Sequence, residues 1–392
     1  AREAILPITE AAAELGYAPV EAEALEARAG IEHHLGDAKA AEAGYLAAIA
    51  RAASGGNDPL AARAWMRLTF LVSIQYRQLE RGLAYARISR GLLDQLGGNV
   101  DTTGNLIANV GKIYVMQGRY EEARAEYLLA LALAEKERGT EGLEAGACHN
   151  LLGNVLARLG QSDQALAELE KSRQLFARNY GPRHPDLMWP LAGVGELLLD
   201  LRRPHEALSR FEEAWGLCVE GLGEDHRDCL EVSIGRATAL SELGRLDEAE
   251  QLLVLADRVL ASDGDFRRSS SLTRLAAVKL QRGHPARALQ LYEQALAIFE
   301  ASAQESVDAS AALLGIGEAK LALGVPHEAL APLERALALR DGKPGGTPHH
   351  LSMIRFALGR ALVAAKRDPL RGARLVEAAR AGFAALGKGA LA

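Results

Sequence analysis

The chain has 392 residues, of which 49% are hydrophobic and only 5% aromatic, with 39 glycines and a visible excess of alanine, leucine, glutamate and arginine. These are helix-forming residues, whereas β-branched and aromatic residues that favour strands are scarce, so an all-α protein is predicted. The formal net charge of −6 excludes a nucleic-acid binder that works by bulk positive charge. No apolar run approaches the roughly 20 residues of a membrane span, and the first residues do not resemble a signal peptide.

The three cysteines, Cys148, Cys218 and Cys229, form no CxxC motif and cannot all pair. Neither a disulfide framework nor a zinc site is indicated by this pattern, and a reducing, cytoplasmic location is expected. The positions of the cysteines in the expected helices favour buried or half-buried thiols over nucleophiles.

A turn signal recurs along the chain in steps of about 40 residues, which predicts a repeat protein. Each unit has a helix, a tight turn, a second helix and a polar loop. In chain order the turns are expected at Gly36, near Leu79, at Gly118, Gly160, Arg202, Gly244, Gly283 and Gly324, and near Lys366. About nine units are predicted, at residues 17–56, 57–97, 98–138, 139–180, 181–222, 223–263, 264–303, 304–345 and 346–388.

Small and bulky residues stand at fixed distances from these turns. In the fifth unit Gly195 lies seven residues before the turn, Ala207 five after it and Phe211 nine after it, and most other units have the same residue types there. A small side chain lets two helix axes approach closely. The pattern therefore predicts that a bulky side chain of the second helix packs against a small residue of the first.

Two units depart from this register. In the second unit Leu71 or Val72 stands where a small residue is expected, and Ala84 fills the alanine position only if the turn is centred on Leu79. The last unit has an apparent two-residue insertion around Arg367 to Leu370.

Helix–turn–helix units with these small residues, and with an aromatic residue or leucine between two alanines of the second helix, resemble the tetratricopeptide repeat. Its usual period is about 34 residues, and loops such as GPRHPD (Gly181–Asp186) and GEDHRD (Gly223–Asp228) resemble the connectors of longer, kinesin-light-chain-type repeats. HEAT and armadillo repeats share the length but do not require this register. The resemblance implies a single α-solenoid over residues 1–392, coiled into a right-handed superhelix whose concave surface is lined mainly by the first helices.

Two strings mimic active sites. The triplet HRD at residues 226–228 matches the catalytic loop of protein kinases, but the asparagine that should follow is Ser233. Residues 342–347 contain P-loop residue types in the wrong order, with a proline among them. Both strings are expected to be loops between repeats.

The histidine pairs His33-His34 and His349-His350 have no further ligand at metal-binding spacing, so surface histidines are expected. No Ser-His-Asp arrangement or nucleophile elbow is present. The sequence therefore predicts no enzyme activity, no cofactor and no metal site.

The resemblance places partner contacts on the first helices, thirteen, ten, nine, six and two residues before each turn. Asparagine is unfavourable inside a helix, so its presence there needs a reason. An asparagine amide can donate to and accept from the backbone of an extended peptide; the alternative is that the amides bond only to neighbouring helices. The candidate peptide-binding residues are Asn105, Asn109, Lys112, Asn150, Asn154, Arg158, Trp189, Glu196, Asp200, Glu231, Thr238 and Glu242.

The charges of these candidates change along the chain. Lys112 and Arg158 would favour a carboxylate, while Glu196, Asp200 and their successors would favour a basic group. Trp189 either anchors a partner or packs under the Gly181–Asp186 loop.

The predicted function is a non-catalytic interaction scaffold that binds an extended peptide or protein segment of opposite charge at its two ends, and neither nucleic acid nor membrane. The string LLGNVLARLGQSDQALAELEKS (151–172) is also similar to C-terminal regions of bacterial, especially myxobacterial, serine/threonine kinases. One alternative is therefore the sensor arm of such a kinase, with the catalytic domain upstream of Ala1. A second alternative is a structural module that self-associates.

Overall fold

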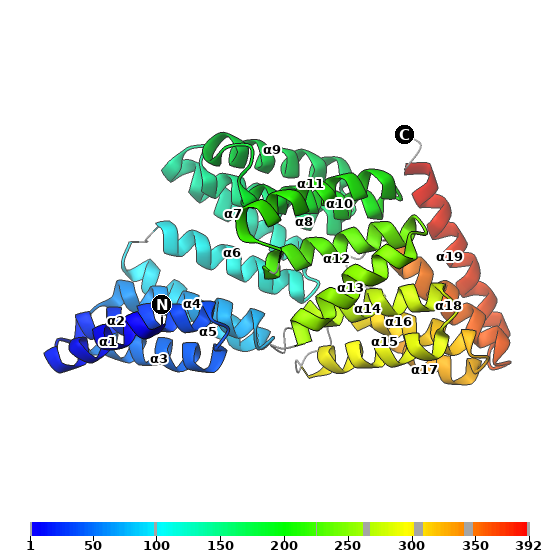
Figure 1. Ribbon diagram of the computed structural model, residues 1–392, viewed down its shortest axis with the longest axis horizontal. Coiled ribbons are helices and arrows are strands. Elements are labelled where there is room, and N and C mark those ends of the chain that lie inside the picture. Colours follow the sequence, from blue (N-terminus) through cyan, green and yellow to red (C-terminus); the bar gives the residue numbers. More distant parts are fainter. Residues whose placement is uncertain are drawn as a thin grey trace. The chain divides into compact units, whose positions relative to one another are not determined.

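The computed structural model describes residues 2–97, 100–224, 226–261, 267–301, 309–340 and 348–389, and every regular element in these ranges is helical (Figure 1). The all-α prediction is confirmed. The helices are α1 (Arg2–Leu15), α2 (Ala18–His34), α3 (Ala38–Ser54), α4 (Asp58–Ile74), α5 (Leu79–Gln95), α6 (Val100–Met116), α7 (Tyr120–Arg138), α8 (Leu143–Arg158), α9 (Ser162–Tyr180), the 3-10 helix η1 (Pro185–Leu187), α10 (Met188–Asp200), α11 (Pro204–Leu222), α12 (Arg227–Glu242), α13 (Leu246–Ala261), α14 (Arg267–Gln281), α15 (Pro285–Glu300), α16 (Ala309–Ala322), α17 (Pro326–Arg340), α18 (Pro348–Ala364) and α19 (Pro369–Gly389).

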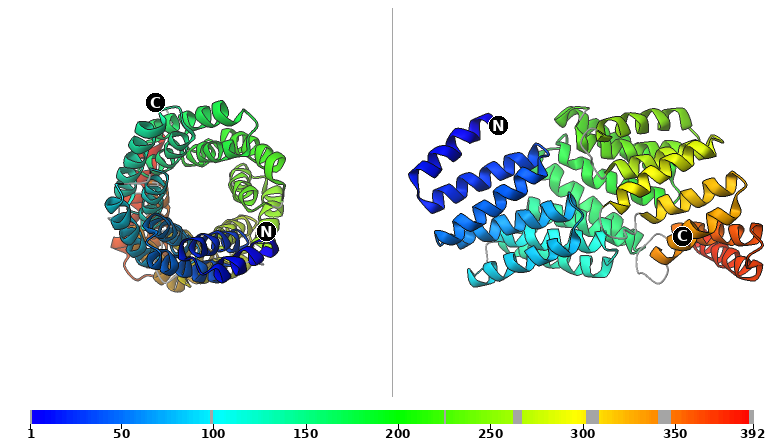
Figure 2. Two further views of the ribbon diagram at one scale, coloured as in Figure 1. Left: turned by 90° about the vertical axis from the view of Figure 1, so that its left-hand side faces the viewer. Right: turned by 90° about the horizontal axis from the view of Figure 1, so that it is seen from below.

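Consecutive helices from α2 onward form antiparallel pairs joined by tight turns, which can be followed by colour in Figure 2. We call the even-numbered members of these pairs, α2 to α18, the A helices and their partners, α3 to α19, the B helices. From α8 to α18 each A helix contacts the next A helix, and the B helices from α11 to α17 also contact the A helix that follows them. The predicted α-solenoid of paired helices is confirmed.

The chain divides into two compact units. Unit 1 comprises Ala1–Gln117 and Ala125–Thr140, and unit 2 comprises Gly118–Arg124 and Glu141–Ala392. The candidate residues at positions 105, 109 and 112 fall in unit 1, and those from 150 to 242 fall in unit 2. The boundaries of the nine repeats stay a prediction.

Each turn inside a pair contains one residue with positive φ. Glycine holds this place in six turns, and a long basic residue holds it at Arg77, Arg202 and Lys366. The second turn is therefore centred on Arg77, two residues earlier than the sequence pattern suggested. The small residue five positions after this turn is therefore Gly82 and not Ala84. A Cβ atom added to Gly82 would overlap the hydroxyl of Ser73 on α4, whereas Ala84 is exposed.

The last pair has a smaller irregularity than expected. Its B helix begins at Pro369, three residues after the positive-φ residue Lys366, whereas the other B helices begin two residues after theirs. The insertion is one residue, not two.

Bulky residues of several B helices, among them α7, α9, α11 and α17, lie against glycines of the A helices. Phe211 of α11 lies between α10 and α12. A Cβ atom added to Gly195 of α10 would be 2.8 Å from the Phe211 ring, and one added to Gly235 of α12 would overlap that ring. The side chain of Leu333 meets Gly317 in the same way. The predicted packing of bulky residues against small ones is thus present in the structure.

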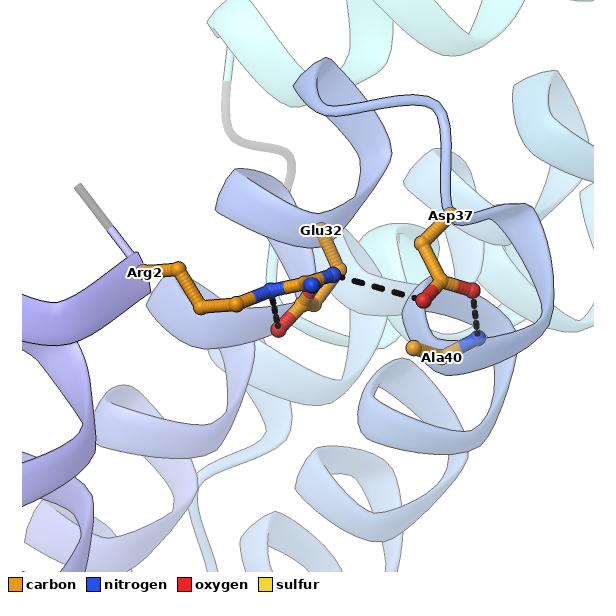
Figure 3. A network of polar contacts seen from close by, with 4 residues as sticks. All are labelled: Arg2, Glu32, Asp37 and Ala40. Carbon is orange, nitrogen blue, oxygen red and sulfur yellow. Dashed lines mark hydrogen bonds and ion pairs between the residues drawn. The ribbon is translucent and has the colours of Figure 1, made fainter. Parts of the chain in front are cut away.

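Helix α1 precedes the first pair and is tied to it by one guanidinium group (Figure 3). Arg2 Nε donates to Glu32 Oε2 at the end of α2 (2.9 Å), and Arg2 Nη2 donates to Asp37 Oδ2 (3.3 Å). The other oxygen of Asp37 accepts from the backbone N–H of Ala40 (3.1 Å) and caps the start of α3. A single side chain thereby joins three helices.

Gly235→Ala should destabilise unit 2, because the added methyl group would overlap the Phe211 ring in a close-packed interior. We expect the free energy of unfolding to fall by about 1–3 kcal/mol. Gly216→Ala in α11 is the matched control: nothing lies within 4 Å of its added methyl group, and relief from helical glycine should raise stability by about 0.5–1 kcal/mol. Urea denaturation followed by circular dichroism measures the free energy of unfolding of both variants. If both variants change it by the same amount, Phe211 does not pack closely against Gly235.

Candidate functional site

The A helices of unit 2 present a polar face, here called the A face, that curves inward. Arg274 Nη2 of α14 lies 4.0 Å from Glu196 Oε2 of α10, although α12 lies between these helices in the layer. Packed helices are about 8–10 Å apart, so in a flat layer these two side chains would be too far apart to meet. The A face of unit 2 is therefore concave, as expected for the first helices of the repeats.

Asn150, Asn154 and Arg158 lie on one face of α8, four residues apart. Asn154 is exposed, and its side-chain oxygen lies beside Gly193 of α10. A Cβ atom added to Gly193 would be 2.8 Å from this oxygen. The Asn150 side-chain oxygen is buried and accepts no hydrogen bond from the described residues. Its acceptor capacity is not used by the neighbouring helices.

Four predicted residues of α10 and α12 gather around Arg274. Thr238 Oγ1 accepts from Arg274 Nη1 (2.6 Å), and Glu196 faces the same guanidinium. Asp200 and Glu242 are close enough to Arg274 for its charge to act on their pKa values. The structure thus brings Glu196, Asp200, Thr238 and Glu242 together, and we call these four residues with Arg274 the acidic cluster.

Two arginines, Arg274 within the acidic cluster and Arg202 beside it, were not among the sequence candidates. Arg274 stands nine residues before the turn residue Gly283, which is one of the offsets used for the earlier units, so its position could have been read from the sequence. Arg202 Nη1 donates to Glu242 Oε1 (3.0 Å), and it is the positive-φ turn residue itself, a position that the offsets do not include. These guanidinium groups offset part of the negative charge.

The carboxyl group of Asp200 titrates abnormally. Burial raises its pKa to about 6, with the charges of Glu196 and Glu242 acting in the same direction and those of Arg158 and Arg274 opposing it. Burial likewise raises the pKa of Glu242. The acidic cluster therefore holds carboxyl groups whose charged form is unfavourable in the free protein.

Trp189 and Glu231 are the other two candidates in unit 2. Trp189 is half-buried and packs against the main core of unit 2, so at least part of its ring serves packing. Glu231 is exposed, and its Oε2 lies 3.9 Å from Arg267 Nη1 of α14.

The three candidates in unit 1 lie on α6 in different environments. Asn105 is exposed, whereas Asn109 is buried and its Nδ2 donates to the Met66 sulfur of α4 (3.6 Å). Lys112 Nζ lies 5.3 Å from the ring centroid of Phe70. Burial lowers the pKa of Lys112, and no carboxylate among the described residues acts on that pKa.

The motifs that mimic active sites have structural roles where they are described. His226 Nδ1 accepts from the backbone N–H of Asp228 (3.3 Å) and caps the start of α12. The HRD triplet is thus the beginning of a helix after an inter-repeat loop. The P-loop-like string 342–347 lies outside the described residues.

The histidine pairs are less exposed than expected. His34 is exposed, but His33, His349 and His350 are half-buried. Burial, followed by the charge of Arg340 and other nearby groups, lowers the pKa of His350 to about 3. Among the described residues no group of three or more His, Cys, Asp or Glu side chains could hold a metal ion.

The cysteine prediction was wrong for two of the three residues. Cys218 of α11 and Cys229 of α12 form a disulfide, with their Cα atoms 5.6 Å apart, while Cys148 is buried outside it. Motif spacing did not reveal this pair because the two cysteines flank an inter-repeat loop, and only the packing of α12 on α11 brings them together.

Comparisons with known proteins agree with the repeat pattern. Residues 102–172, 147–217 and 268–303 match family models described as Tetratricopeptide repeat. The protein KINESIN LIGHT CHAIN-RELATED 1 of Arabidopsis thaliana is 26% identical over 246 residues, which is 60% of this chain and 39% of that protein. Residues 102–217 and 268–303 therefore match the tetratricopeptide repeat, and the chain is similar to a kinesin light chain-related protein.

A secreted RxLR effector protein of Plasmopara halstedii is also similar, with 26% identity over 196 residues, 48% of this chain and 59% of that protein. The chain therefore spans between 39% and 59% of the length of these two relatives.

Two solved structures share the solenoid fold at low identity. A Rap protein complexed with Competence and Sporulation Factor superimposes with a TM-score of 0.67 and 11% identity, covering 94% of this chain and 99% of that chain. The apo form of RapI superimposes with a TM-score of 0.55 and 16% identity, covering 72% of this chain and 98% of that chain. The likeness concerns the fold alone. No described helix of our chain has the length and apolar content needed to cross a membrane.

Asp200→Asn should stabilise the protein at high pH. The native pKa of about 6 lies above that of an unfolded aspartate, about 3.9, so the native state holds an extra proton between about pH 4 and pH 6 and stability falls as pH rises through this window. We expect the variant to gain about 1–3 kcal/mol at pH 8 and little at pH 4. Denaturation at both pH values measures this. Asp163→Asn, at an exposed site of α9, should show no such gain; an equal gain at both pH values for Asp200→Asn would contradict the assignment.

Proposed function

We propose that this chain is a non-catalytic scaffold that binds an extended peptide or protein segment along the A helices. The observation that carries the proposal is the pair of amides on α8, with Asn150 retaining a buried oxygen that accepts no hydrogen bond from the described residues. A peptide N–H group could satisfy this oxygen once the Asn150 side chain turns toward the surface of the A helices, because an asparagine amide both donates and accepts. Concave solenoid surfaces are suited to this kind of binding.

The Rap complex supports the proposal at the level of fold. A solenoid that superimposes on most of this chain is complexed with Competence and Sporulation Factor, so the fold is compatible with holding a second molecule. Which molecule binds here depends on the side chains of the A helices. These differ from one repeat to the next, as expected for a surface that recognises a particular segment.

The charges indicate which partner groups each unit would suit. In unit 1, Lys112 is a largely buried cation on which no described carboxylate acts, so a partner carboxylate would stabilise its charged form. In unit 2 the acidic cluster would accept a basic side chain, which would compete with Arg274 for the carboxylates. An acidic group of a partner would thus suit unit 1, and a basic group would suit unit 2. A cytoplasmic location, the kinase-arm alternative and self-association stay predictions.

Replacing both amides, Asn150→Ala plus Asn154→Ala, should weaken partner binding. Peptides selected on the wild type from a random display library serve as probes, and their Kd should rise by roughly tenfold or more because two amide contacts are lost. Fluorescence anisotropy measures Kd, with circular dichroism as the check on folding. Gln164→Ala plus Gln174→Ala removes two exposed amides from the paired helix α9 and should leave Kd unchanged. A folded double asparagine variant with wild-type Kd would contradict the groove.

Lys112→Ala should weaken those selected peptides that carry a carboxylate. Loss of a charge-assisted contact predicts a rise in Kd of roughly tenfold, reduced at high salt. The same peptides with the carboxylate amidated should bind wild type and variant alike. Lys39→Ala removes an exposed lysine from the B helix α3 and is the control. Equal loss for the acidic and amidated peptides would show that Lys112 does not read a carboxylate.

A further inference from the structure

The disulfide between Cys218 and Cys229 closes one particular joint of the solenoid. Cys218 lies in the last turns of α11 and Cys229 in the first turn of α12, on either side of the loop that links two repeats. Both residues are fully buried in the main core of unit 2. The bond therefore fixes the start of one A helix against the end of the preceding B helix from inside the protein.

The preceding inter-repeat loop shows how the same joint is built without cysteine. Both loops begin with a positive-φ glycine, Gly181 or Gly223, and in both a histidine accepts from the backbone N–H two residues later. At the positions equivalent to the two cysteines the earlier joint has Phe176 and Leu187, which are buried in the same core.

Two large apolar side chains hold the earlier joint through the area that they bury. Two cysteine side chains are smaller and bury less apolar surface, so the covalent bond between them adds to what holds the later joint. Its stability should then follow the redox state of the sulfur atoms, which is not the case for the joint at Phe176 and Leu187.

The rest of the α11–α12 contact does not depend on sulfur. In the middle of the pair Phe211 lies against Gly235, and the guanidinium of Arg236 stacks on Trp215 with 5.1 Å between the guanidinium carbon and the ring centroid. Opening the bond would therefore loosen the loop end of α12 while the middle stays packed. A change confined to one joint distinguishes a local device from a bond that the whole fold requires.

We propose that Cys218 and Cys229 form a redox-operated clip that closes this joint under oxidising conditions and releases it under reducing ones. To close it, one cysteine thiolate attacks a small-molecule disulfide, forms a mixed disulfide and expels one thiolate. The second cysteine then attacks the protein sulfur of the mixed disulfide and expels the other. Two electrons pass from the cysteines to the oxidant, which leaves as two thiols carrying the two protons.

Burial sets the conditions for this exchange. Neither sulfur is exposed in the folded protein, so a reagent reaches it only when the joint opens locally. The clip should thus respond to sustained changes in the thiol–disulfide balance and not to brief ones. Such a clip is compatible with a reducing interior, where it would rest open, and it does not depend on the function proposed above.

The test combines the redox state with local opening. The purified chain is equilibrated with reduced and oxidised glutathione in varied ratio, and its thiols are trapped with an alkylating reagent in denaturant. Mass spectrometry should find Cys218 and Cys229 protected at oxidising ratios and alkylated at reducing ones, with Cys148 alkylated throughout. Reduction should lower Tm by several degrees, roughly 3–10 °C. Hydrogen exchange should rise at residues 219–224 and 226–230, with no change at 181–187.

Matched variants separate the clip from other effects of reductant. Cys148→Ala should respond to reductant as the wild type does, and Cys218→Ala plus Cys229→Ala should show the lowered Tm and no response. Cys218→Phe plus Cys229→Leu, which copies the earlier joint, should lose the response and regain part of the stability. If Cys218 and Cys229 are alkylated at every glutathione ratio, or if reduction leaves exchange at the joint unchanged, the proposal is wrong; the wild-type measurements decide this even if a variant fails to fold.

Discussion

In most of the helix pairs a bulky side chain of the B helix lies against a glycine of the A helix, and the close spacing of the two helices depends on this contact. Phe211 shows its geometry most clearly, because its ring fills the space next to Gly195 on one side and Gly235 on the other. Each repeat buries its apolar face only against its neighbours, so no central core corrects an error in this spacing. The composition follows from it: abundant alanine and glycine with few aromatics is what such a contact requires.

The same spacing produces the polar chemistry of unit 2. Because the A helices lie close together and their layer curves, Arg274 of α14 comes within 4.0 Å of Glu196 of α10. Polar groups from three successive repeats then share one partly desolvated volume, and burial there raises the pKa of Asp200. Neither the contact between Arg274 and Glu196 nor the raised pKa of Asp200 belongs to a single repeat. Both arise from small residues that point toward the B helices, on the opposite side of the A helices from the charges.

Periodic features could be predicted from the sequence, whereas single exceptions could not. The recurrence of turns and small residues was sufficient for the all-α solenoid. It failed at the second turn because Arg77 adopts a positive φ that glycine usually signals, which displaced the expected small residue from Gly82 to Ala84. Four of the six candidate residues on α10 and α12 lie together, whereas Trp189 and Glu231 do not. Arg202 was missed because it is itself the turn residue from which the offsets are counted.

The cysteine pair was hidden for a related reason. Residues 218 and 229 are far apart for a local motif, and their proximity follows from the packing of α12 on α11. Comparison between repeats supplies the information that motif spacing lacks. Where one repeat replaces Phe176 and Leu187 by two cysteines, a joint held by apolar area becomes one held in part by a bond. In a protein made of similar units, a position where one unit changes the type of interaction is therefore the best place to look for a property that the other units do not have.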